Sequence, residues 1–122
     1  MRLLWVENHA GFVRIAGKQF LSAHELTVAP SLAAARDALR AGAFDAVLLD
    51  YDLDDGKGTD LIALIRESHP VTVVVAVSSH EDGNAALLAA GADGVCSKGK
   101  FAGIESVLAS VCASKLRTIT EK

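Results

Sequence analysis

The stretch Val71-Thr-Val-Val-Val-Ala-Val77 holds five valines in seven residues and decides the fold. A run of this length that is rich in β-branched residues predicts a strand buried on both faces. Four more short apolar runs lie at residues 3–6, 26–29, 46–49 and 94–97. Helical periodicities follow the runs, at residues 12–20, 32–41, 59–69, 85–90 and 101–112. The apolar face of the first helix is formed by Phe12, Ile15, Ala16 and Phe20, and the candidate N-caps of the second and third are Ser31 and Thr59. Five strand–helix units predict an α/β domain whose parallel sheet is covered on both faces.

Composition narrows the possible functions. The chain has 122 residues, enough for one domain, and 51% hydrophobic residues favour a folded core. Lys and Arg number 12 against 15 Asp and Glu, so the net charge is −3 and direct nucleic-acid binding is not expected. No apolar run approaches the length of a membrane span, and no secretory leader is evident. Cys96 and Cys112 lack metal spacing, so we expect reduced thiols in a cytoplasmic protein.

Polar residues follow four of the five predicted strands. Glu7 and Asn8 come after the first strand, Asp50 after the third, Ser78 after the fourth and Lys98 after the fifth. Ligands of doubly wound sheets bind beyond the carboxyl ends of the strands, so these side chains should share one site.

The residue types at this edge indicate phosphoryl chemistry. Carboxylates suit Mg²⁺, which keeps several waters and a phosphate oxygen as ligands. A hydroxyl and an ammonium would complete a phosphoryl-binding site, and no glycine-rich phosphate loop is present. Asp50, at a strand end, is then the candidate nucleophile for an aspartyl phosphate. For Asp54 and Asp55, a helix cap or a solvated loop position is the favoured explanation, and for Ser79 a helix cap explains the residue as well as a functional role does.

The chain resembles a bacterial two-component receiver domain over about residues 2–116. The resemblance depends on Asp45-Ala-Val-Leu-Leu-Asp50 followed by Gly58, on the valine-rich run ending at Ser78, and on Ala90-Gly-Ala-Asp-Gly-Val-Cys-Ser-Lys98. It implies a CheY-like, flavodoxin-type sheet of strand order 2-1-3-4-5. Residues 117–122 would then be a tail or the start of a linker.

The resemblance also implies site roles. Asp50 is the phosphoacceptor, Ser78 the switch hydroxyl and Lys98 the phosphate-binding lysine. Mg²⁺ would be held by Glu7, Asn8, Asp50 and the backbone carbonyl of Asp52.

Three residues depart from the pattern of the family. Asn8 stands where a second acid is usual, so Mg²⁺ should bind weakly. Val95 replaces the frequent switch aromatic residue. Gly99 follows Lys98 where proline is common, which is similar to receivers of the NarL/FixJ type.

The implied partners are a sensor histidine kinase or a phosphotransfer protein. The resemblance allows an effector domain beyond Lys122 and a homodimer after phosphorylation, and the domain would catalyse only its own phosphorylation and dephosphorylation.

Two alternatives stay open at this stage. One is a pseudo-receiver that binds partners without phosphorylation, which Asn8 and Val95 favour. The other is a TOPRIM-like Mg²⁺-dependent nuclease, because Glu7 and the Asp50-Tyr-Asp52 motif match its acidic pattern.

Overall fold

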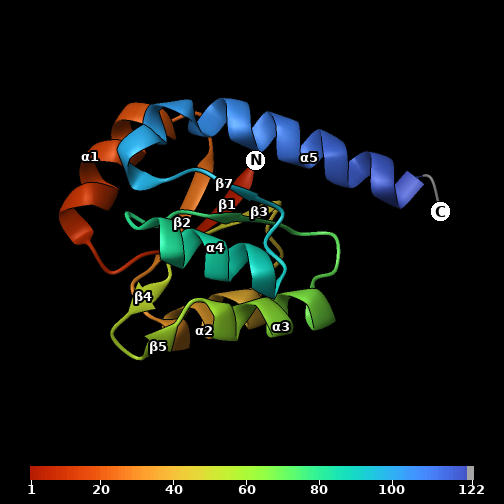
Figure 1. Cartoon of the computed structure of the whole chain (residues 1–122), viewed down its shortest axis with the longest axis horizontal. Helices are drawn as coiled ribbons and strands as arrows, with labels where there is room; N and C mark the ends of the chain where they lie inside the picture. Colours follow the sequence, from red (N-terminus) through yellow and green to blue (C-terminus); the bar gives the residue numbers. More distant parts are fainter. Residues whose placement is uncertain (121–122) are drawn as a thin grey trace.

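The computed structural model describes residues 1–120 and has a five-stranded parallel sheet as its centre (Figure 1). The sheet strands are β1 (Arg2–Val6), β2 (Glu25–Ala29), β3 (Ala46–Leu49), β6 (Val73–Ala76) and β7 (Gly94–Val95). Their order is β2-β1-β3-β6-β7, which confirms the predicted 2-1-3-4-5 order of the five main strands. A short antiparallel pair, β4 (Asp52–Leu53) and β5 (Gly56–Lys57), lies in a segment that the sequence predicts as a loop.

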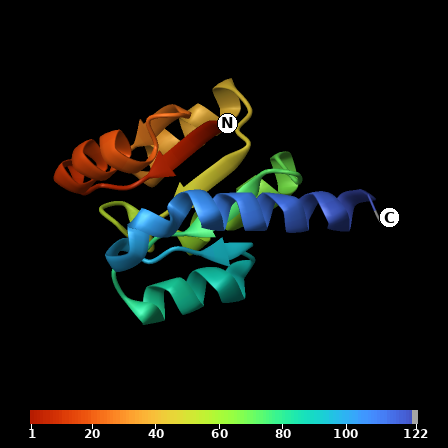
Figure 2. The same cartoon turned by 90° about the horizontal axis from the view of Figure 1, so that it is seen from above.

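The helices form a layer on each face of the sheet. Figures 1 and 2 show α1 and α5 on one face and α2, α3 and α4 on the other. Their bounds are α1 (Ala10–Phe20), α2 (Leu32–Ala41), α3 (Thr59–Ser68), α4 (Glu81–Ala90) and α5 (Ile104–Thr120), with the 3₁₀ segment η1 (Lys98–Gly103) before α5. Alternating side chains of the buried strands supply two core clusters, one beneath each layer. The doubly wound prediction is therefore confirmed.

Some local predictions need correction. Ile15 was expected on the apolar face of α1, but its side chain is 62% exposed. The α4 helix begins at Glu81, four residues before the predicted start. Gly58 rather than Thr59 is the N-cap of α3, whereas Ser31 caps α2 as predicted, accepting a hydrogen bond from the Ala34 amide.

The C-terminal helix extends past the sheet. Figure 2 shows the second half of α5 continuing beyond the strand layer. The helix includes residues 117–120, for which a tail or linker was expected, and residues 121–122 lie outside the described part of the chain. The domain boundary near residue 116 stays a prediction. None of the helices within residues 1–120 is both long and apolar enough to span a bilayer.

The strand register places the predicted functional residues at one edge of the sheet. Val6 of β1 is level with Leu49 of β3, which is level with Ala76 of β6. The residues that follow these positions therefore emerge together at the carboxyl edge, and they include Glu7 and Asp50.

Candidate functional site

Three of the predicted site residues form a buried ionic cluster. The Nζ atom of Lys98 lies 2.7 Å from Oε1 of Glu7 and 3.2 Å from Oδ2 of Asp50. The Glu7 side chain is 0% exposed and that of Asp50 is 7% exposed. One ammonium thus neutralises part of the charge of two buried carboxylates, which would otherwise be costly to bury side by side.

Backbone amides orient the two carboxylates. The amide of Tyr51 donates to Oδ1 of Asp50 at 2.8 Å, and the amide of His9 donates to Oε2 of Glu7 at 3.1 Å. Oε1 of Glu7 has no hydrogen-bond partner of good geometry, so its contact with Lys98 is an ion pair. Each carboxylate therefore has one oxygen held by the backbone and one oxygen facing Lys98.

Burial and the neighbouring charges together shift the pKa values of Glu7 and Lys98. Burial raises the pKa of Glu7 above its usual 4.5, and the negative charge of Asp50 raises it further, against the contacts with Lys98 and the His9 amide. Burial alone would lower the pKa of Lys98, but its contacts with Glu7 and Asp50 outweigh burial and the pKa is raised. Lys98 is therefore charged at neutral pH.

One aromatic ring lies beside the ammonium group of Lys98. The Nζ atom of Lys98 lies 5.6 Å from the ring centroid of Phe12 in α1. A ring face attracts a cation, so Phe12 helps to hold the ammonium beside the carboxylates. The sequence pattern places Phe12 only on the apolar face of its helix and does not indicate this contact.

Gly58 allows the loop after Asp50 to close. A Cβ atom at Gly58 would lie 2.0 Å from the carbonyl oxygen of Asp50, a distance no side chain tolerates. The Gly58 amide donates to the carbonyl of Tyr51 at 2.7 Å. Because its φ of −56° is an ordinary helical value, glycine is required here for space and not for backbone conformation.

The side chains of two predicted metal-site residues, Asn8 and Asp52, bond to residues outside the ionic cluster. Asn8 is exposed, and its Nδ2 donates to Oδ1 of Asp54 at 3.0 Å. The Asp52 side chain pairs with Lys57 across the β4–β5 hairpin. Within residues 1–120, no three His, Cys, Asp or Glu side chains gather as a metal site. The metal-binding roles of Asn8 and Asp52 stay predictions.

Ser78 is joined to the cluster through the backbone. Its carbonyl accepts a hydrogen bond from the Lys98 amide at 3.2 Å, and its Oγ accepts one from the His80 amide at 3.2 Å. The side chain of Asn84 contacts the Ser78 backbone at both its amide and its carbonyl. Asn84 was not singled out from the sequence, although a polar residue just before the apolar Ala-Ala-Leu-Leu-Ala-Ala run was a usable signal.

Asp55 has a structural role, in agreement with one of the two interpretations of the acidic loop. Its two carboxylate oxygens accept hydrogen bonds from the amides of Leu32 and Ala33, at 2.9 and 3.0 Å. These bonds lower the pKa of Asp55 from its usual 3.8. Asp55 therefore caps the N-terminus of α2 from a distant loop.

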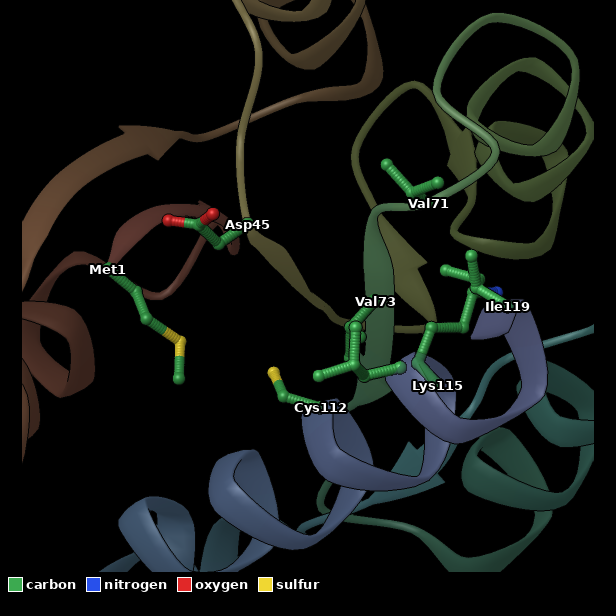
Figure 3. A pocket seen from close by; sticks show the side chains of 8 residues that line it. Met1, Asp45, Val71, Val73, Cys112, Lys115 and Ile119 are labelled. Atoms are coloured by element: carbon green, nitrogen blue, oxygen red, sulfur yellow. The ribbon is translucent and has the colours of Figure 1, made fainter. Parts of the chain in front are cut away.

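An apolar pocket lies at the opposite end of the sheet. Its volume is about 380 Å³, and Figure 3 shows Cys112 and Ile119 of α5 on one side with Val71 and Val73 on another. Met1 and Asp45 complete it near the amino ends of β1 and β3. The ionic cluster is thus at the carboxyl edge and does not share this pocket.

The chain belongs to the response regulator receiver domain family, whose model matches residues 3–107. A search of curated proteins found no match.

Solved structures share the fold at low sequence identity. A CheY-like receiver domain protein from Methanospirillum hungatei is 17% identical, with a TM-score of 0.83, over 96% of this chain and 97% of that one. The regulator TrrA from Thermotoga maritima, solved with Mg²⁺ and BeF, is 17% identical, with a TM-score of 0.80 over 90% and 97%. A regulator from Burkholderia pseudomallei, solved with a phosphorylated aspartic acid, a calcium ion and citrate, is 19% identical, with a TM-score of 0.78 over 98% and 71%.

Proposed function

We propose that this domain is a phosphorylation switch whose acceptor is Asp50. The observation that carries the proposal is the buried Asp50 carboxylate, paired with Lys98 at 3.2 Å at the end of the central strand β3. Membership of the receiver family supports the same role. The donor would be a sensor histidine kinase or a phosphotransfer protein, and the domain would act in the cytoplasm.

The transfer would be a displacement at phosphorus. A carboxylate oxygen of Asp50 forms the new P–O bond while the P–N bond of a phosphohistidine breaks, and the leaving imidazole takes up a proton. Lys98 stays charged and offsets negative charge on the phosphoryl oxygens. Glu7 holds the lysine in place from the other side.

The acidic edge is chemically suited to Mg²⁺. Glu7 and Asp50 offer carboxylate oxygens, including the Glu7 oxygen that has no hydrogen bond, and Asn8 and the Asp52 carbonyl would add neutral oxygen ligands. When bound, the metal would neutralise charge on the transferred group. Because Asn8 would contribute an oxygen ligand without a charge, weak metal binding is expected.

Phosphorylation would then change the partner surface. New contacts of Lys98 and the Ser78 hydroxyl to phosphoryl oxygens would favour one of two pre-existing conformations. An effector domain or a second copy of the chain would respond to that change.

The test is labelling with acetyl phosphate and Mg²⁺, followed by intact-mass measurement. We expect a gain of one phosphoryl group in the wild-type domain and none in Asp50→Asn. Asp54→Asn is the matched control and should still be labelled. Labelling of Asp50→Asn at the wild-type level would refute the acceptor assignment.

The pseudo-receiver alternative is favoured by one contact, the hydrogen bond from Asn8 to Asp54, which employs both side chains without a metal. An unlabelled wild-type domain would support it. We do not propose the nuclease alternative, because the receiver family match includes the residues on which it depended.

A further inference from the structure

The side chain of Asn84 holds the backbone of Ser78 at two points. Oδ1 of Asn84 accepts from the Ser78 amide at 2.9 Å, and Nδ2 donates to the Ser78 carbonyl at 3.2 Å. Both residues are buried. The partners are a fixed donor and a fixed acceptor, so they determine the orientation of the amide group. The side-chain amide of Asn84 thus pairs with the backbone amide and carbonyl of Ser78, as the backbone of an adjacent β-strand would.

This contact is distinct from helix capping. Asn84 is the fourth residue of α4, whereas the N-cap is His80, which makes no side-chain cap. The Asn84 side chain bonds to a residue six positions earlier and not to its own helix. Because asparagine is a poor residue for a helix interior, its role here is the link to Ser78.

The Ser78 carbonyl is shared with the lysine segment. It accepts from Nδ2 of Asn84 and from the backbone amide of Lys98, both at 3.2 Å. One peptide group therefore connects the α4 helix to the residue that pairs with Asp50. A displacement of Ser78 must alter both bonds.

Gly83 brings α4 against the serine hydroxyl. A Cβ atom at Gly83 would lie 2.7 Å from Oγ of Ser78 and 3.0 Å from Cβ of Tyr51. The first turn of α4 is therefore packed directly on the Ser78 side chain and on the residue after Asp50. The Ser78 hydroxyl therefore lies close to the first turn of α4.

We propose that Asn84 is a positioning residue that couples Ser78 and the Lys98 backbone to the α4 helix. The proposal rests on the proposed function of Asp50 and Ser78, and it assigns the route by which the switch reaches the surface. In this chain, Val95 offers no aromatic ring to transmit a movement of Ser78. The paired amide contact supplies that connection instead.

The decisive experiment is amide-resolved hydrogen exchange of the unmodified domain, comparing wild type with Asn84→Ala. Loss of two buried hydrogen bonds should speed exchange about tenfold or more at Ser78, at Lys98 and in the first turn of α4. Asp82→Ala, an exposed truncation in the same turn, is the control and should leave Ser78 and Lys98 unchanged. Faster exchange confined to α4 would overturn the coupling and leave a purely local role.

A second measurement follows the conformational change that phosphorylation causes. Amide chemical shifts are compared before and after treatment with acetyl phosphate and Mg²⁺, at equal extents of modification. In Asn84→Ala the shift changes within α4 should fall to less than about half of those in wild type, while those near Asp50 persist. Changes of wild-type size in α4 would overturn the proposal.

A replacement variant and a readout that needs no phosphorylation distinguish failure of the coupling from failure of the proposed function. If Asn84→Ala does not fold, Asn84→Ser replaces it, because the shorter neutral side chain keeps a polar group in the buried position but cannot reach the Ser78 amide and carbonyl together. Absence of any mass gain in wild type refutes the proposed function, whereas the exchange comparison needs no phosphorylation and still decides the coupling.

Discussion

At the scale of single residues, the contact between Asn8 and Asp54 bears on the proposed metal site. The Asn8 amide donates to the Asp54 carboxylate at 3.0 Å, and the resemblance described above implies an acid at position 8. A second carboxylate in this place would lose the hydrogen bond and face Asp54 directly. Metal affinity and metal-free stability are therefore linked at this position.

Asn8→Asp should bind Mg²⁺ about tenfold more tightly, since ligand charge is a main determinant of hard-cation affinity. Without metal, the same variant should unfold at a lower temperature than wild type because the new carboxylate repels Asp54 and Glu7. Calorimetric titration with Mg²⁺ and thermal unfolding in chelator measure the two effects.

The matched control is the double variant Asn8→Asp with Asp54→Asn. It restores an acid–amide pair with the roles exchanged, so it should regain metal-free stability. Equal Mg²⁺ affinity of wild type and Asn8→Asp would show that position 8 is not a ligand position.

At the scale of secondary-structure elements, the N-terminus of α2 depends on a loop far along the chain. Ser31 satisfies the Ala34 amide, and Asp55 satisfies those of Leu32 and Ala33. Unpaired amides at a helix start destabilise it, and the negative charge of Asp55 favours the positive end of the helix dipole. The β4–β5 hairpin is thereby fastened to α2.

Asp55→Ala should lower the thermal midpoint and speed hydrogen exchange in both α2 and the β4–β5 hairpin at neutral pH. The lowered pKa of Asp55 fixes the sign with pH. Its contribution is present above its usual 3.8 and is lost as the pH falls through the lower folded value, so the two proteins should converge in acid. Asp37→Ala, also exposed and acidic but distant from the helix start, is the control. Unchanged exchange in α2 would disprove this capping role.

The elements differ in how far the sequence could predict them. The buried strands could be predicted from the composition and length of their apolar runs. A short apolar run such as that of β6 is typical of a strand that is buried on both faces of a sheet. The start of α4 and the exposure of Ile15 depend on tertiary neighbours, which no local pattern contains. A helix cap was one sequence interpretation of Asp55, but the helix that it caps could not be predicted, because α2 lies more than twenty positions earlier in the chain.

The residues of the candidate site also differ in how far the sequence could predict their contacts. Glu7, Asp50 and Lys98 could be grouped from sequence because parallel strands bring their carboxyl ends to one edge. The contacts of Asn8 with Asp54 and of Asn84 with Ser78 depend on side-chain direction in loops and on the packing of α4. Spacing along the chain does not determine either.

At the scale of the whole molecule, the ionic cluster makes stability depend on pH. The native pKa of Glu7 lies above its usual 4.5, so the native state holds more protons than the unfolded chain between the two values. The free energy of unfolding must then fall as the pH rises through this window. The fall reflects the burial of an ionised carboxylate beside Asp50.

Glu7→Gln removes that titration. We expect its unfolding free energy, relative to wild type, to increase as the pH is raised from about 4 to 7, because only wild type must ionise a buried acid. Urea unfolding at a series of pH values measures the difference. Glu67→Gln, at an exposed position of α3, should follow wild type at every pH. A constant difference between Glu7→Gln and wild type across the range would contradict the shifted pKa of Glu7.

The aromatic stack beneath Lys98 gives the domain its own optical reporter. Trp5, the one tryptophan of the sequence, is fully buried, and its ring lies parallel to that of Phe101 at 5.0 Å between centroids. Phe101 is three residues after Lys98 in η1, and Phe12, over which the ammonium lies, meets the Trp5 ring edge-on at 5.6 Å. Any shift of the lysine segment must therefore change the surroundings of a single indole. Intrinsic fluorescence can follow switching in the unlabelled protein, in real time and without a bound dye.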